Sequence, residues 1–216
     1  MPRSRRAANT LAQELLMKPT IGDDDVVTVL RKWYFGRNKI RTNVFPEGAT
    51  SVHSDTLGLV RSRDGRVVVS RMTTKNSDVF RLLCKWIRDQ LPALYSMPFV
   101  FTGISVNFGY AARKHRDGNN VGPSMTKSFG NFAGGGLRYW PNDDGLCNID
   151  QLRERNAMHV DTKRSMLLFD GHRCHSVASF SGERYSLVFF TTIDHHKAGQ
   201  AEAAFLAAAR GCMANA

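Results

Sequence analysis

The segment "KHRDGNN" (residues 114–120) places His115 and Asp117 two positions apart. In an extended strand, residues i and i+2 point to the same face, so the imidazole and the carboxylate could bind one ion together. Two histidines and one carboxylate on one side of Fe(II) form the facial triad of non-haem oxygenases, which leaves coordination positions open. The pair alone is a weak signal, because "RDGNN" is also typical of a charged surface turn.

A third metal ligand has to come from a distant strand. His175 is the best candidate, because the buried strand predicted in "SMLLFDG" (165–171) leads through an Asp-Gly turn into the β-rich run that His175 begins. His172 is the alternative, but it follows the turn immediately. The sequence therefore predicts His115, Asp117 and His175 as metal ligands and as the catalytic centre.

A cation and a hydroxyl group follow the third histidine. Arg184 lies nine residues after His175, and Ser186 lies two further on, on the same face of a predicted strand. Arginine binds a carboxylate through two parallel hydrogen bonds, and a serine hydroxyl can add another. This order of residues predicts a site for the cosubstrate 2-oxoglutarate, although Arg184 could also be a charge at a sheet edge.

The elements that must position these residues change type along the chain. Helical patterns are predicted at 9–18, with Asn9 as N-cap, and at 76–95, where Pro92 should end or kink the helix. Residues 23–35 are predicted as a helix or as a helix followed by a strand. A hairpin is predicted at 48–73 around Asp64-Gly65. From residue 98 the pattern is β, with two strands expected around Ser181-Gly182, and the Ala-rich end is helical. We expect residues 1–97 to pack as a helical and hairpin region on a β core of 98–194, with a C-terminal helix at 195–216, in one compact domain.

The composition favours a polyanionic partner. Thirty Lys and Arg residues stand against nineteen Asp and Glu residues, a formal net charge of +11, and nucleic acid is the commonest partner of such proteins. The four cysteines form no CxxC pair, and no apolar run reaches the length of a membrane span. The N-terminal segment lacks the apolar part of a secretory signal. We therefore expect an intracellular protein, nuclear if it is eukaryotic and acts on DNA, with no membrane and no obligate protein partner.

Four segments together resemble a known family. "NFGYAARKHRDGNN", "GNFAGGGLRYW", "FDGHRCHSV" and "GERYSLVFF" look like the TET/JBP branch of the 2-oxoglutarate- and Fe(II)-dependent dioxygenases, over roughly residues 98–193. The resemblance implies a mainly β fold with flanking helices around a double-stranded β-helix (jelly-roll) core. It also implies Fe(II), 2-oxoglutarate and dioxygen as cofactors, and some members of the branch use ascorbate instead of 2-oxoglutarate.

The resemblance also implies residues for the substrate. In that branch, an Asn three positions after the metal-binding Asp contacts the target base, which corresponds to Asn120. An aromatic residue six positions after the cosubstrate Arg stacks on the base, which corresponds to Phe190, where those enzymes carry Tyr. Asn120 could equally be a turn residue, and Phe190 a core aromatic residue. The next base-contacting position is His in those enzymes and Thr192 here, so the identity of the base is open. Asn107 and Tyr110 are candidates for lining the cosubstrate pocket.

The expected activity is oxidation of a methyl group on a nucleic-acid base, 5-methylcytosine or thymine, with DNA as the expected substrate. A base inside a duplex would have to be flipped out, and basic contacts to phosphates could offset the cost of flipping. Arg37, Lys39 and Arg41, the arginines of the 61–66 hairpin, and the basic residues 113–116 are candidates for such contacts. Two alternatives are a 2-oxoglutarate-dependent hydroxylase of a protein side chain such as proline, or of a small molecule, and a catalytically silent binding module.

Overall fold

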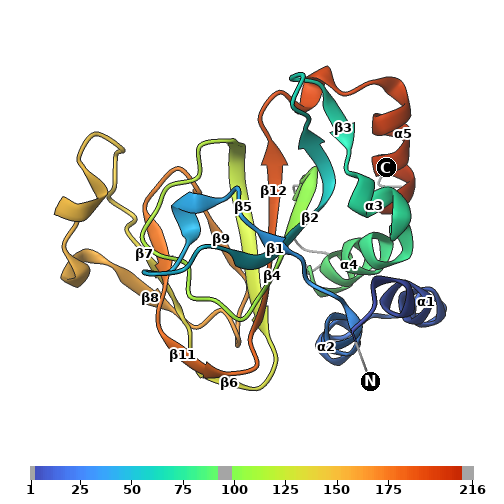
Figure 1. Ribbon diagram of the computed structural model, residues 1–216, viewed down its shortest axis with the longest axis horizontal. Coiled ribbons are helices and arrows are strands. Elements are labelled where there is room, and N and C mark those ends of the chain that lie inside the picture. Colours follow the sequence, from blue (N-terminus) through green and yellow to red (C-terminus); the bar gives the residue numbers. More distant parts are fainter. Residues whose placement is uncertain (1–2, 92–98, 211–216) are drawn as a thin grey trace. The chain divides into compact units, whose positions relative to one another are not determined.

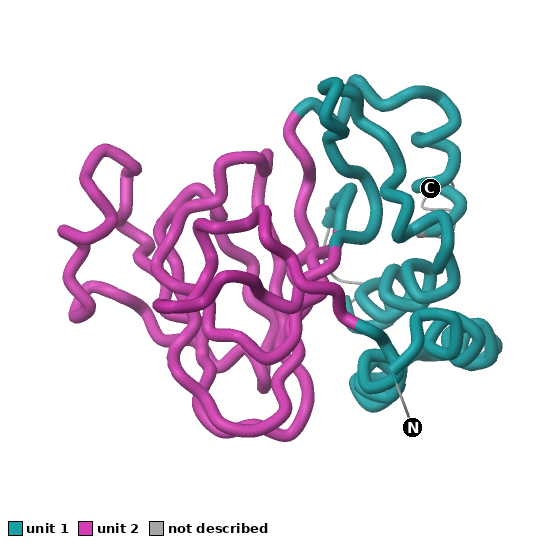
Figure 2. Tube along the Cα trace, viewed as in Figure 1, with its two compact units in different colours: residues 1–34, 56–103, 194–216 teal, residues 35–55, 104–193 magenta. Residues whose placement is uncertain are grey.

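The computed structural model describes residues 3–91 and 99–210. Within these ranges, the contact pattern divides the chain into two compact units. Unit 1 comprises residues 1–34, 56–103 and 194–216, and unit 2 comprises residues 35–55 and 104–193 (Figure 2). The part of the 195–216 helix prediction that covers 211–216, and the predicted role of Pro92, lie outside the described residues. No helix of the described chain is long and apolar enough to span a membrane.

Unit 1 is mainly helical. Its helices are labelled in Figure 1, and β2 and β3 form the predicted hairpin, with Leu59 opposite Val69. The elements of this unit are α1 (Arg5–Leu15), α2 (Asp23–Lys32), β2 (Val52–Arg61, whose first four residues belong to unit 2), β3 (Val67–Val69), α3 (Arg71–Lys75), α4 (Ser77–Gln90), η4 (His195–Lys197) and α5 (Gln200–Arg210).

The core of unit 1 is built around the apolar face of α4. Seven residues of this helix are buried, Trp86 and Phe80 among them, as the apolar spacing of the sequence predicts. The helix predicted at 9–18 begins earlier, because Ser4 rather than Asn9 caps α1. Asn9 instead accepts hydrogen bonds from the backbone amides of Asp78 (3.0 Å) and Val79 (3.3 Å), so it caps α4.

Unit 2 consists of two main antiparallel sheets and a short strand pair. The first sheet has the order β1-β2-β4-β12-β5-β9, the second has the order β10-β7-β8, and β11 pairs with β6. The elements are β1 (Arg37–Asn38), η1 (Thr42–Val44), β4 (Gly103–Phe108, of which Gly103 is assigned to unit 1), β5 (Asn120–Phe129), β6 (Phe132–Gly134), β7 (Leu137–Tyr139), η2 (Ile149–Gln151), η3 (Glu154–Asn156), β8 (Met158–Val160), β9 (Leu167–Phe169), β10 (His175–Val177), β11 (Phe180–Gly182) and β12 (Tyr185–Thr192).

The chain of unit 2 alternates between the two sheets. It runs from β4 in the first sheet to a segment that bridges β10 through His115, back to β5, and then to β7 and β8 in the second sheet. It returns to the first sheet in β9, crosses to β10, and ends in β12 of the first sheet. This alternation is that of a double-stranded β-helix, so the predicted fold class, mainly β with helices, is confirmed.

One predicted element differs. Ser181-Gly182 is not the turn between two strands, because both residues lie in β11 and pair with Ala133 and Phe132 of β6. Glu183 and Arg184 separate β11 from β12, but the pairing register with β6 and β5 is the same on both sides of them, so the two strands continue one antiparallel ladder. The sequence pattern missed this because three strands follow one another within eighteen residues, and a Ser-Gly pair is a usual signal of a turn.

Candidate metal centre

A backbone bridge brings the two histidines of the centre together. The amide of His115 donates to the carbonyl of His175 (3.0 Å), and the amide of His175 donates to the carbonyl of His115 (2.9 Å). The two imidazole rings lie 4.2 Å apart between centroids, and both side chains are buried. Residues 60 positions apart in sequence are thus held side by side by the main chain.

Hydrogen bonds also select which ring nitrogen of each histidine is available. Nδ1 of His115 lies 2.7 Å from the carbonyl oxygen of Arg113, and Nδ1 of His175 lies 2.9 Å from that of Arg173. A carbonyl oxygen only accepts, so each Nδ1 carries the proton and each Nε2 keeps its lone pair. Outer hydrogen bonds of this kind are typical of metal-binding histidines.

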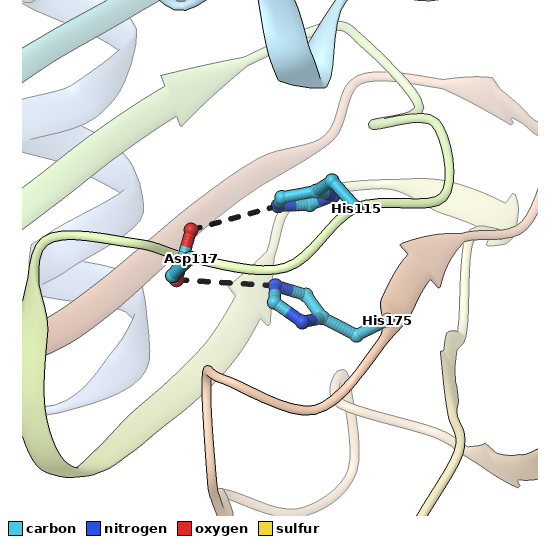
Figure 3. A group of neighbouring side chains, drawn as sticks. All are labelled: His115, Asp117 and His175. Atoms are coloured by element: carbon cyan, nitrogen blue, oxygen red, sulfur yellow. Dashed lines mark ion pairs between the residues drawn. The ribbon is translucent and has the colours of Figure 1, made fainter. Parts of the chain in front are cut away.

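Asp117 completes the group (Figure 3). Its Oδ1 lies 3.7 Å from Nε2 of His115, and its Oδ2 lies 3.9 Å from Nε2 of His175. All three ligand atoms lie within 4.8 Å of one another. Two ligand atoms that each lie about 2.1 Å from an ion can be at most about 4.2 Å apart. The distances of 3.7 and 3.9 Å between the carboxylate and the two rings are within this limit.

The charge state of the group also suits a cation. Burial, and next the neighbouring His175, lower the pKa of His115 from 6.5 to about 4, although Asp117 opposes the shift. His115 is therefore neutral at pH 7, as a metal ligand must be. The carboxylate of Asp117 supplies the negative charge that a divalent ion requires.

The competing histidine lies elsewhere. His172 is exposed, and its Nδ1 lies 3.2 Å from Oδ1 of Asp170. The cluster contains His175 and not His172. The structure therefore brings together the three residues that the sequence predicts as ligands.

Arg116 points away from the metal ligands and ties their segments together. Its guanidinium donates to both carboxylate oxygens of Asp143, at 2.6 and 2.7 Å. The side chain of Asp143 is fully buried, and its Oδ2 also accepts from the amide of Cys174 (2.6 Å), next to His175. Arg116 lowers the pKa of Asp143 to about 2, so the carboxylate stays charged. Sequence reasoning missed Asp143, because it lies in an irregular loop with no motif.

Arg184 is a buried cation. It is 4% exposed, it donates to Oγ of Ser128 (2.8 Å), and its guanidinium lies over the rings of Phe132 and Phe180 at 5.5 and 5.4 Å. Its Nε has no hydrogen-bond partner, and no carboxylate contacts the guanidinium anywhere in the described parts of the chain. Burial lowers the pKa of Arg184 to about 10. A buried arginine without a counter-ion is unfavourable, so this position is suited to an anionic ligand.

The other predicted cosubstrate residues form a hydrogen-bonded cluster. Nδ2 of Asn107 lies 3.4 Å from Oγ of Ser186, and the hydroxyl of Tyr110 donates to Oδ1 of Asn107 (2.9 Å). Burial raises the pKa of Tyr110, while the charges of Arg41 and Arg184 oppose the shift. Tyr110 therefore interacts electrostatically with both arginines.

The predicted substrate residues lie at the start of β5 and the end of β12. Nδ2 of Asn120 donates to Oδ2 of Asp117 (3.0 Å), and Thr192, which is buried, is the strand partner of Asn120. Phe190 is half-buried at the β-bulge of β12. Asn120 thus contacts a candidate metal ligand, and substrate contacts by these three residues stay predictions.

Arg41 reaches the centre from the segment after β1. Its guanidinium donates to Oγ of Ser105 (2.9 Å) and lies 4.0 Å from Oδ1 of Asp117, with 32% of the side chain exposed. The sequence suggests Arg41 only as one of several phosphate contacts, because nothing in its local pattern connects it with an aspartate 76 residues later.

Comparisons with known proteins add little to this geometry. No family model matches the sequence, and no curated protein matches it. The solved structures that match include NgTET1 in complex with 5mC DNA (16% identity, TM-score 0.48), which aligns over 65% of this chain. This chain spans only 61% of the length of that protein.

Two further solved structures are prolyl hydroxylases. The prolyl-4-hydroxylase of Pseudomonas putida has 14% identity and a TM-score of 0.41, covering 86% of this chain and 98% of that one. The prolyl hydroxylase of Trichoplax adhaerens, in complex with a hypoxia inducible factor peptide fragment, has 16% identity and a TM-score of 0.43, covering 89% and 91%. Likenesses this weak carry no argument about function, so the centre is interpreted from its own geometry.

Proposed function

We propose that the chain is an Fe(II)- and 2-oxoglutarate-dependent dioxygenase. The observation that carries the proposal is the cluster of two unprotonated Nε2 atoms and one carboxylate, from His115, His175 and Asp117, in a double-stranded β-helix. Two imidazoles and one carboxylate on one side of an ion leave positions open for a cosubstrate and dioxygen. This ligand set suits Fe(II) better than a structural zinc ion, which is enclosed by four protein ligands.

Arg184 supports the choice of 2-oxoglutarate as the cosubstrate. Its buried guanidinium requires an anion, and a carboxylate of 2-oxoglutarate would supply one, with Ser186, Asn107 and Tyr110 as further polar neighbours. When bound, Fe(II) and 2-oxoglutarate would together reduce dioxygen, so that a C–H bond becomes C–OH while 2-oxoglutarate becomes succinate and carbon dioxide. The residues of this chain would hold the ion, orient the cosubstrate and exclude water.

For the substrate, we infer a methyl group on a nucleic-acid base, 5-methylcytosine or thymine. The excess of basic residues and the resemblance of the four segments around the centre support this substrate class. Arg41 is partly exposed beside Asp117, where it could contact a phosphate of a flipped nucleotide. Asn120, Phe190 and Thr192 would then lie near the base.

Succinate formation tests the oxygenase proposal. We expect the wild type to release succinate from 2-oxoglutarate only with Fe(II) present, and His175→Ala to release none, because two ligands do not hold the ion. His172→Ala is the matched control, since it removes an exposed histidine three residues away. Wild-type release without iron, or full activity of His175→Ala, would contradict the proposal. Turnover with ascorbate in place of 2-oxoglutarate would overturn the assignment of the cosubstrate alone.

Mass spectrometry of nucleosides tests the substrate. The full chain would be incubated with single-stranded and duplex DNA and with RNA, each carrying 5-methylcytosine and thymine or uracil. We expect a gain of one oxygen on a base methyl group that depends on both iron and 2-oxoglutarate. Oxygen gained by a proline-containing peptide, with no change in any nucleoside, would replace this substrate by a protein side chain and leave the oxygenase proposal standing.

A further inference from the structure

Unit 1 carries most of the positive charge of the protein. Its segments contain sixteen of the thirty Lys and Arg residues and nine of the nineteen Asp and Glu residues, so it holds +7 of the net +11. None of these residues belongs to the candidate metal centre, which lies in unit 2. The candidate metal centre therefore does not explain the positive charge of unit 1.

Part of this charge lines a hollow formed by residues of α1 and α3 together with Asn76. The hollow has a volume of about 720 Å³ and is lined by four cations, three neutral polar side chains and one methionine, with no acidic residue: Arg5, Arg6, Asn9, Thr10, Arg71, Met72, Lys75 and Asn76. A second hollow, of about 460 Å³, shares Arg6 and Thr10 with the first and adds Lys32, together with one acid, Glu14. We call these two adjoining hollows the basic groove.

Three cations of the groove differ from other basic residues of unit 1. Lys18, Arg66 and Lys85 each pair with an aspartate, at 2.6 to 2.8 Å. Arg6, Arg71 and Lys75 are exposed, and none of them forms an ion pair within the described residues. Their charges are therefore available to a ligand.

The position of Arg6 in α1 is unfavourable without such a ligand, whereas the guanidinium of Arg5 lies over the rings of Trp33 and Tyr34. Arg5 and Arg6 occupy the first turn of the helix, which contains no acidic residue. The positive end of the helix dipole disfavours exposed cations there. A bound anion would reverse the sign of this interaction.

We propose that the basic groove binds the sugar–phosphate backbone of a nucleic acid, without reading its sequence. Cations spread over two adjoining hollows fit a row of phosphates better than one isolated phosphate. No aromatic side chain lines either hollow, so bases are not expected to stack there. An acidic peptide is less well matched, because Met72 is the only large apolar side chain lining the main hollow. The partner belongs to the same class as the proposed substrate, and the groove would hold it through a different unit.

Salt-dependent binding tests the groove in the full chain. A fluorescent 20-base-pair duplex would be titrated with wild type and with Arg6→Gln/Arg71→Gln/Lys75→Gln at several salt concentrations. Each lost phosphate contact should make the slope of log K against log[salt] shallower by about 0.9, so the triple variant should lose about 2 to 3 units of slope. At low salt we expect its affinity to fall at least tenfold.

A charge-matched variant is the control. Arg153→Gln/Arg155→Gln/Arg164→Gln removes three exposed cations outside the groove and changes the net charge equally. Circular dichroism would show that both variants are folded. Equal loss of binding in the two variants, or wild-type binding by the groove variant, would overturn the proposal. Wild-type binding of polyglutamate as tight as that of the duplex, lost equally in the groove variant, would assign the groove to acidic peptides instead.

This test is independent of the oxygenase proposal. Binding is measured without iron, and succinate release is measured without nucleic acid. If the groove variant binds weakly but still releases succinate, the two proposals both hold. If the wild type does not bind the duplex, the groove proposal fails, and succinate release still decides the oxygenase proposal.

Discussion

At the scale of single residues, the candidate metal centre is defined by which nitrogen of each histidine carries a proton. Carbonyl oxygens of Arg113 and Arg173 fix the proton on Nδ1, so each Nε2 faces Asp117 with its lone pair. The hydrogen bond from Asn120 occupies Oδ2 of Asp117, which leaves Oδ1 as the less engaged oxygen. The chemistry of the centre is therefore set by neutral hydrogen-bond partners around the ligands.

The lowered pKa of His115 predicts how the metal-free protein responds to acid. The unfolded chain takes up a proton on this histidine as the pH falls through 6.5, whereas the folded chain does so only near pH 4. Between these values the unfolded state binds more protons, so folding stability falls with falling pH. We expect His115 to account for a loss of at most about 2 kcal/mol between pH 7 and pH 5.

Chemical denaturation at pH 7 and pH 5, with metal removed, measures this loss. His115→Asn should lose less stability than the wild type across the interval, because its amide does not titrate. The exposed His172→Asn is the control and should behave like the wild type. An equal loss in His115→Asn and the wild type would show that burial does not hold His115 neutral.

At the scale of elements, Asp143 connects the two segments that carry the candidate metal ligands. Arg116 lies between His115 and Asp117, and the amide of Cys174 precedes His175, so one carboxylate contacts both segments. The mutual hydrogen bonds of His115 and His175 lie beside this contact. The distance between the segments of His115 and His175 therefore depends on Asp143, a loop residue that is not itself a candidate ligand.

Asp143→Asn should weaken metal binding without removing a ligand. The amide cannot accept from both guanidinium nitrogens and the Cys174 amide, so we expect a metal affinity 10- to 100-fold lower, as for other outer-sphere partners. The folding stability should fall by about 2 to 3 kcal/mol, less than for a fully buried pair, because the Arg116 side chain is 22% exposed. Isothermal titration calorimetry with Co(II), with the exposed Asp144→Asn as control, checks this. Unchanged affinity in Asp143→Asn would show that the loop does not position the ligands.

The elements that could be predicted from sequence are those with strong local signals. The Asp64-Gly65 hairpin and the apolar stripe of α4 follow from turn chemistry and helical spacing, and both are present. The spacing of His115 and Asp117, two positions apart, is an equally local signal. Asp143 and Arg41 could not be predicted, because their roles depend on contacts with residues 31 and 76 positions away, respectively, which no local pattern encodes.

At the scale of the whole molecule, the unit that contains the metal centre is discontinuous in sequence. The sequence pattern suggests a core at 98–194, but the contact pattern adds residues 35–55 to residues 104–193. Phe35 is 4% exposed and stacks on Phe108 and Tyr185, with ring centroids 5.3 and 5.9 Å apart. Ser54 donates to Oδ1 of Asn107 (2.8 Å). The change from a helical to a β pattern near residue 98 could not reveal these contacts of Phe35 and Ser54, because they join segments far apart in the sequence.

A fragment of residues 98–194 should therefore not fold to the structure of unit 2. It lacks the aromatic ring that covers Phe108 and Tyr185, the hydroxyl that binds Asn107, and Arg41 beside Asp117. Loss of one buried phenylalanine alone costs about 3–5 kcal/mol, a large part of the stability of a small domain. Near-ultraviolet circular dichroism of the fragment and the full chain checks this. A fragment with a native spectrum and cooperative unfolding would show that residues 35–55 are dispensable.

The paired backbone hydrogen bonds of His115 and His175 have a consequence for metal selection. The main chain positions both imidazole rings, so the conformational entropy of ordering them is lost when the protein folds and not when the ion binds. The ion therefore binds to two nitrogen ligands that are already in place. A site of this kind does not discriminate by shape among divalent ions, and Co(II), Ni(II) and Cu(II) bind nitrogen ligands more tightly than Fe(II) does. For the proposed oxygenase, we expect mismetallation to be the main way in which correctly folded protein becomes inactive, so that the activity of a preparation follows its history of exposure to metals.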